Sequence, residues 1–246
     1  MRRIQIQHLE GSVAQSFVER LLMFESTVCI DASYVESYSE RYAAILSTGL
    51  SSIEASTDAD VCFTFFSQEN IITVDSEDSC SHIRLHDVLP TGPNKGLNHP
   101  FLEQLWSQKE SLLQATGVHY WVSESDVVEA LVRIALHSPN LPETVDIAGR
   151  RGWSAQQTID EFSMLWQRTQ AGTKGTFTAS LLDQPPSPKI SVVPIQDVVE
   201  HERPPLGALH DVLMQCDEQG WQPTSCLLYT SPSPRDATLS RMPSSA

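Results

Sequence analysis

Apolar positions in the first part of the chain switch between strand spacing and helix spacing. Ile4 to Gln7 alternates apolar and polar residues, and Val13 to Met23 then places apolar side chains three and four residues apart. Thr27 to Ile30 is a short apolar run, and Ser39 to Ala55 shows helical spacing again. Alternation predicts a strand, and spacing of three or four predicts an amphipathic helix. We therefore expect strand, helix, strand and helix in this order.

The rest of the chain continues this alternation. It predicts strands at Val61 to Phe66, Ile83 to Val88 and Glu143 to Ala148, and helices at Asp126 to His137 and from the N-cap Ser154 to Gly172. Proline clusters at residues 184–188 and 204–205 predict a linker and a second break. Strands that alternate with helices are typical of an α/β fold with a parallel sheet.

Charge and apolar content exclude some classes of partner. The formal net charge is −15 and no basic stripe appears, so we expect no nucleic-acid partner. No segment approaches the roughly 20 apolar residues of a membrane helix, so we expect no membrane contact. Cys29, Cys62, Cys80 and Cys216 form no C-x-x-C pair, which favours reduced thiols and a cytoplasmic setting.

The C-terminal residues match a translated sequencing adapter. Codons of a transposase-type library adapter read as Cys226 to Asp236, and the constant stretch after its index reads as Ser240 to Ala246. A disordered Ser/Pro tail would explain the composition of this segment but not the order of its residues. We therefore leave residues 226–246 out of the fold and expect the natural protein to continue beyond Thr224.

The N-terminal segment, residues 3–22, resembles the opening of the extended short-chain dehydrogenases, the nucleotide-sugar epimerase/dehydratase family. In that family a strand leads into G-x-x-G-x-x-G and then a helix, and here His8, Gly11 and Ala14 stand at the three glycine positions. A β-carbon at the first position obstructs the tight turn, whereas Ala14 is a mild change. Asp31 lies 20 residues after Gly11, about where the family's acidic residue holds the adenosine ribose. A rival alignment places Val28 to Ser33 on a later strand and removes this role.

Further segments in the same order extend the resemblance to residues 1–224. They are the helix beginning at Tyr42, the strand from Val61 to Ser67, the strand with Asp87, the segment from His119 through Asp126, Glu143 to Ser154, and Gly220 to Thr224. The resemblance implies a Rossmann-like parallel sheet with helices on both faces, shortened, plus a small C-terminal substrate lobe. It implies NAD or NADP as cofactor, Ser67 as a catalytic residue, and Asp87 and His119 at substrate-binding positions.

The resemblance also predicts domain boundaries. Residues 1–182 would form the NAD(P)-binding domain, with a substrate-lobe segment inserted near 93–118, and residues 183–225 would be the remnant of the substrate lobe. A nucleotide sugar is the implied ligand, and the resemblance leaves a homodimer open.

The chemistry of the family is incomplete in this sequence. It needs tyrosine and lysine at Y-x-x-x-K spacing on one helix, and no such pair occurs. The residues between Ser67 and Ile83 are too few for the usual loop and helix. Tyr34, Tyr38 and Tyr42 are better explained by amphipathic packing, and the pair His82 and His86 lacks further ligands, so we predict no metal site.

Three functions remain open. The chain is either a diverged, catalytically impaired relative that binds nucleotide as a sensor or partner subunit, or an active enzyme whose recorded sequence lacks the catalytic helix. A non-enzymatic interaction scaffold is the third hypothesis.

Overall fold

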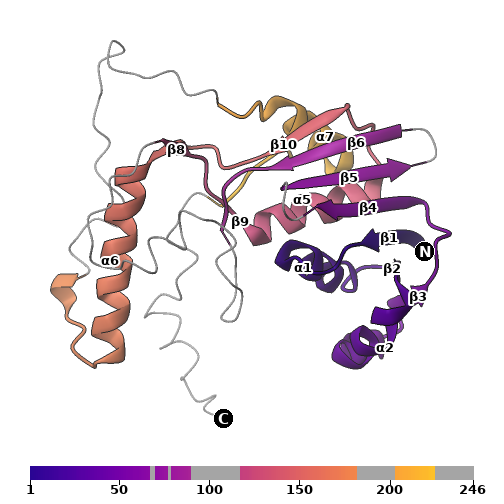
Figure 1. The fold of residues 1–246 in the computed structure, drawn as a ribbon, viewed down its shortest axis with the longest axis horizontal. Helices are drawn as coiled ribbons and strands as arrows, with labels where there is room; N and C mark the ends of the chain where they lie inside the picture. Colours follow the sequence, from indigo (N-terminus) through magenta and orange to yellow (C-terminus); the bar gives the residue numbers. More distant parts are fainter. Residues whose placement is uncertain (67–69, 77–78, 90–116, 182–202, 225–246) are drawn as a thin grey trace.

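A seven-stranded sheet organises the fold and occupies the right-hand part of the view in Figure 1. The computed structural model describes residues 1–66, 70–76, 79–89, 117–181 and 203–224. The strand order across the sheet is β10-β6-β5-β4-β1-β2-β3. The bounds are β1 Arg2–Gln7, β2 Ser26–Ile30, β3 Ser51–Ala55, β4 Val61–Phe66, β5 Ile71–Ser76, β6 Ser79–Leu85 and β10 Thr144–Ile147. Two small sheets pair β7 (Val88–Leu89) with β9 (Val122–Ser123), and β8 (Val118–His119) with β11 (Trp153–Ser154).

Strands β1 to β4 form a Rossmann-like parallel unit. β1 lies between β2 and β4, β3 lies outside β2, and all four strands are parallel. Helix α1 (Ser12–Leu21) connects β1 to β2, and α2 (Ala32–Arg41) with α3 (Ala43–Leu46) connects β2 to β3. The order 3-2-1-4 is that of doubly wound folds, in which the strand order reverses beside the first strand. The predicted α/β class with a Rossmann-like sheet is confirmed, and the sheet, predicted to be parallel, is mostly parallel.

Beyond β4 the next two strand pairs of the sheet, β4 with β5 and β5 with β6, are antiparallel. β5 is antiparallel to β4 and to β6, with Phe66 opposite Ile71 and Ser76 opposite Ser79. An antiparallel neighbour can follow after a short turn, whereas a parallel neighbour needs a crossover of a dozen or more residues. The chain from β4 to β6 therefore turns back and forth within the sheet. No helix lies between β4 and β6 in the described residues.

The prediction of one helix over Ser39 to Ala55 is wrong. The helical part begins earlier, at Ala32, and the last five residues of the predicted helix are strand β3. Gly49 has a φ of 72°, which ends the helical segment because a residue with a β-carbon rarely adopts that conformation. Pairing with β2 then places Ser51 to Ala55 in the sheet.

The predicted strand over Ile83 to Val88 is divided into two. β6 ends at Leu85 and β7 begins at Val88. Between them Asp87 has a φ of 45°, a left-handed conformation that cannot continue a strand.

The hydrophobic core lies against one face of the main sheet. The ring of Phe17 on α1 lies 5.0 Å from that of Phe63 and 5.9 Å from that of Phe65, both on β4. Helices α1, α2, α5 (Glu124–His137) and α7 (Gly207–Asp217) contribute to the same core. Because side chains alternate along a strand, Phe66 points to the other face, where it is 41 % exposed. Helices covering this second face, which we expected, are not among the described residues.

The C-terminal part of the chain returns to the sheet. Helix α7 contacts α5 and β10, and the indole nitrogen of Trp221 donates to the carbonyl of Ala148 at 3.0 Å. Helix α6 (Ala155–Thr173) begins as predicted at the N-cap Ser154, whose side chain forms a capping box with Gln157. The predicted domain boundary at residues 182–183, residues 226–246 and the predicted inserted segment near 93–118, apart from its last two residues, lie outside the described residues. None of the helices in the described ranges is long and apolar enough to cross a membrane.

Candidate nucleotide groove

A groove of about 900 Å³ opens at the carboxyl ends of β1, β2 and β3. Its walls are the ends of these strands, the turns at residues 8–10 and 56–58, and Asp31 with the first residues of α2, 32–34. Open α/β sheets bind ligands at this edge, where the strand order reverses, and the volume is that of a small-molecule site. The position and size of the groove make it the candidate site.

Asp31 stands in the wall of the groove, immediately after β2. Its Oδ1 accepts hydrogen bonds from the hydroxyl of Ser33 at 2.5 Å and from the backbone N–H of Ser33 at 2.8 Å, so Asp31 is the N-cap of α2. These two hydrogen bonds hold the pKa of Asp31 below its usual value. The carboxylate is therefore ionised at neutral pH, exposed, and able to accept hydrogen bonds from ribose hydroxyls.

The position of β2 in the sheet bears on the two alignments of Asp31. β2 pairs with β1 on one side and β3 on the other, and β1 separates it from β4. This is the second-strand position of the first alignment. The rival placement of Val28 to Ser33 on a later strand does not agree with this order.

The three residues at the glycine positions lie in the turn from β1 into α1. His8 lines the groove and has a φ of 59°, so the backbone keeps a left-handed conformation that favours glycine. Gly11 is the N-cap of α1 and provides no side-chain hydrogen bond, and Ala14 in the first turn is fully buried. The β-carbon at position 8 therefore does not prevent the turn, although it makes the turn strained.

The charge of the groove suits the ribose of a dinucleotide better than its diphosphate. The N-terminus of α1, with no acidic residue in its first turn, favours an anion. The described lining contains three carboxylates, Glu10, Asp31 and Asp58, and neither lysine nor arginine. Arg3 is close by, but it is engaged with Glu54, Ser56 and the carbonyl of Asp58. The carboxylates suit the hydroxyl groups of a ribose, and the lining suits a diphosphate poorly.

Asp87 and His119, the predicted substrate-binding pair, contact each other. His119 Nδ1 lies 3.0 Å from Asp87 Oδ1, and the N–H of Tyr120 donates to Asp87 Oδ2 at 2.6 Å. The imidazole also stacks on the ring of Trp121 at 4.8 Å. The structure brings the two predicted residues together, but their contacts tie the end of β6 to β8. Ser67, the predicted catalytic residue, lies outside the described residues.

The tyrosines near the groove are not activated for proton transfer. Burial raises the pKa of Tyr42 to about 12 and also raises that of Tyr38, and the negative charge of Glu10 raises that of Tyr34. A tyrosine that exchanges a proton in hydride-transfer chemistry needs a lowered pKa, which a nearby lysine would supply. Their packing agrees with the structural role that we predicted, because Tyr38 and Tyr42 belong to the core.

An ion-pair network on the second face of the sheet was not predicted from the sequence. Asp146 on β10 is only 3 % exposed, and it accepts a hydrogen bond from Arg84 Nη2 at 2.8 Å and faces His86 Nε2 at 2.7 Å. Burial raises the pKa of Asp146, but the hydrogen bonds and charges of Arg84 and His86 outweigh it and lower the pKa. The signal that could have found this network is an aspartate inside an otherwise apolar strand.

The two histidines considered for metal binding have separate partners. His82 Nδ1 lies 3.3 Å from the hydroxyl of Thr73, whereas His86 contacts Asp146. Within the described ranges, no group of three or more metal-ligating side chains lies close enough together to hold an ion.

Fold and groove together define an α/β protein with a Rossmann-like sheet and a ligand groove at the carboxyl edge of its first three strands. No family model matches the chain, and no curated protein matches it. Among solved structures it is similar to an NAD-dependent NDP-hexosamine 5,6-dehydratase, TunA, involved in tunicamycin biosynthesis. That likeness has a TM-score of 0.42 and 12 % identity over 78 % of this chain and 94 % of the other. At this level it identifies neither a family nor an activity.

Proposed function

We propose that the protein binds a nucleotide in the groove over β1 to β3 and carries out no hydride transfer. The observation that carries the proposal is the exposed carboxylate of Asp31 in the groove wall, directly after the strand that neighbours β1. A carboxylate at this place accepts hydrogen bonds from both ribose hydroxyls and repels a 2′-phosphate. If a nicotinamide nucleotide binds, it is therefore NAD rather than NADP. Such a cofactor would supply hydride chemistry only if a proton donor stood near its nicotinamide.

The geometry beyond β4 supports the absence of that chemistry. A helix carrying tyrosine and lysine would have to lie between β4 and β6, where the chain instead forms β5. The alternative, an active enzyme whose sequence lost this helix, would leave an arbitrary junction there. The register from Phe66 opposite Ile71 to Ser76 opposite Ser79 and the buried side chains of Ile72 and Val74 favour a native hairpin.

Calorimetric titration of the purified chain with AMP, adenosine and NAD tests the binding. We expect at least one of them to bind, and Asp31→Asn to weaken its affinity about tenfold, because asparagine keeps the N-cap but loses the charge. Glu36→Gln on the exposed side of α2 removes one charge without touching the groove and should leave binding unchanged. Absence of binding by all three ligands would contradict the proposal.

The absence of hydride transfer has a separate test. With NAD and a panel of nucleotide sugars we expect every sugar to be recovered unchanged by chromatography; absorbance of the reduced nicotinamide alone is not a sufficient readout, because an enzyme that returns the hydride to its substrate accumulates none. Resequencing the transcript addresses the alternative, because an exon encoding Y-x-x-x-K between Ser67 and Ile83 would restore the enzyme hypothesis.

A further inference from the structure

The groove ends at the boundary between β1 and β4. All of its described lining residues belong to β1, β2, β3, the turns after them and the first turn of α2, and none belongs to β4, β6 or β10. A dinucleotide bound at a reversal of strand order extends across this boundary, with one nucleoside on each side. The groove provides walls for only one of the two nucleosides.

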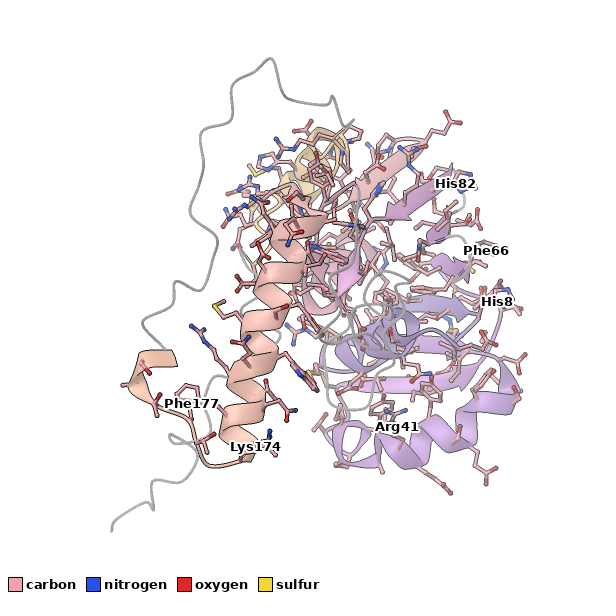
Figure 2. The ribbon with its side chains drawn as sticks, turned by 60° about the vertical axis from the view of Figure 1, so that its left-hand side comes forward. His8, Arg41, Phe66, His82, Lys174 and Phe177 are labelled. Carbon is pink, nitrogen blue, oxygen red and sulfur yellow. The ribbon has the colours of Figure 1, made fainter. Side chains whose placement is uncertain are left out.

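Two aromatic side chains stand at this boundary. The imidazole of His8 lies 5.9 Å from the ring of Phe66, with an angle of 43° between the planes. His8 follows β1 and Phe66 ends β4, and these strands are direct neighbours, with Gln7 paired to Thr64. Figure 2 shows His8 and Phe66 beside each other at the side of the molecule that also carries His82. A glycine at position 8 would leave this place open, because it has no side chain.

The negative charge of the groove lining also disfavours a dinucleotide. Glu10, Asp31 and Asp58 bring three carboxylates to the lining. Each negative charge of a ligand raises the free-energy cost of binding next to them, because like charges repel each other even in water. A neutral nucleoside avoids this repulsion. The diphosphate is the most highly charged part of a dinucleotide, so it is repelled most strongly.

From these observations, and resting on the proposed function, we infer that the groove selects a ribonucleoside and excludes a dinucleotide. Asp31 receives the ribose diol, and the His8–Phe66 pair closes the path toward β4. The implied nicotinamide dinucleotide therefore does not fit this chain, although its adenosine half does.

Titration with adenosine, 2′-deoxyadenosine, ADP and NAD tests this selection. Adenosine should bind at least tenfold more tightly than NAD and ADP, and 2′-deoxyadenosine should lose about tenfold because one hydrogen bond to Asp31 is missing. NAD binding as tightly as adenosine, or more tightly, overturns the inference but leaves the proposed function standing. No binding by any of the four overturns both.

The double variant His8→Gly/Phe66→Ala tests the cause. Removal of both rings should raise the affinity for NAD at least tenfold relative to the affinity for adenosine, with both ligands measured on the same variant. The matched control is His82→Ala, a histidine on the same side of the sheet, which should change neither affinity. An unchanged ratio of the two affinities in a double variant that still binds adenosine and unfolds cooperatively overturns the role of His8 and Phe66.

Discussion

His8 follows β1 with a φ of 59°, and its imidazole reaches the ring of Phe66. Asp146 lies on the same second face of the sheet, buried between Arg84 and His86. Pairing between strands determines what both side chains contact. β1 pairs with β4, which brings Phe66 to His8, and β6 pairs with β10, which brings Arg84 to Asp146. The sequence identified His8 as a departure from glycine, but only the fold shows what its ring contacts.

The backbone at position 8 predicts an ordering of two variants. His8→Gly relieves a left-handed conformation that costs a residue with a β-carbon about 1 kcal/mol, whereas His8→Ala retains that cost. We expect the glycine variant to exceed the alanine variant by about 1 kcal/mol in the free energy of unfolding, measured in urea. Equal stabilities would show that position 8 is not strained.

Asp146 predicts a stability that depends on pH. Asp146→Asn should cost about 1–2 kcal/mol at pH 7, a modest value because Arg84 and His86 are partly exposed. The pKa of Asp146 is lowered in the folded protein, so its contribution is complete above the usual carboxyl pKa of about 3.9 and is lost as the pH falls through the lowered value. Urea unfolding of both proteins at pH 7 and near pH 3 should show the difference shrinking in acid. A difference that is constant over this range would contradict the ion-pair role.

At the scale of elements, the turn after β10 is held by a close backbone contact. The N–H of Gly149 donates to the carbonyl of Tyr120 at 2.8 Å, which joins the end of β10 to the segment between β8 and β9. A β-carbon on Gly149 would lie 2.0 Å from the carbonyl oxygen of Trp121. The contact therefore requires glycine, for reasons of space rather than of φ.

Gly149→Ala should destabilise the protein by more than about 2 kcal/mol, because backbone on both sides must move. Gly172→Ala, within α6, is the matched control: its β-carbon meets nothing within 4 Å, and alanine is the better helix former. We expect that control to be neutral or to stabilise by up to about 1 kcal/mol. Thermal unfolding of both variants distinguishes the two sites, and equal effects would contradict the contact at Gly149.

At the scale of the whole molecule, residues 203–224 complete the helical layer over the sheet. Arg133 of α5 donates to Asp217 and to the carbonyls of Leu213 and Gln219, and Thr224 donates to Asp126 at 2.9 Å. Trp221 fills the space beside β10 and is only 4 % exposed. The end of the described chain is thus part of the same core as its beginning.

Trp221→Ala should cost about 3–5 kcal/mol, because it leaves a cavity and removes the hydrogen bond to Ala148. This is a large share of the 5–15 kcal/mol typical of a domain, so the transition in urea should move to much lower concentration. Gln222→Ala, at an exposed position next to it, should change stability by less than about 0.5 kcal/mol. A small effect of Trp221→Ala would show that residues 203–224 are not integral to the core.

Local pattern by itself determined β1, α1, β2, β4, α5, β10 and the start of α6, because periodicity and capping residues act within a few positions. It also placed Asp31 after the second strand, where the groove has its wall. Only the tertiary structure decided that Ser51 to Ala55 is a strand and that the chain after Phe66 turns into an antiparallel hairpin. The physical reason is that strand pairing and ion pairs such as that of Arg84 with Asp146 join residues far apart in the sequence, whose proximity no local pattern encodes.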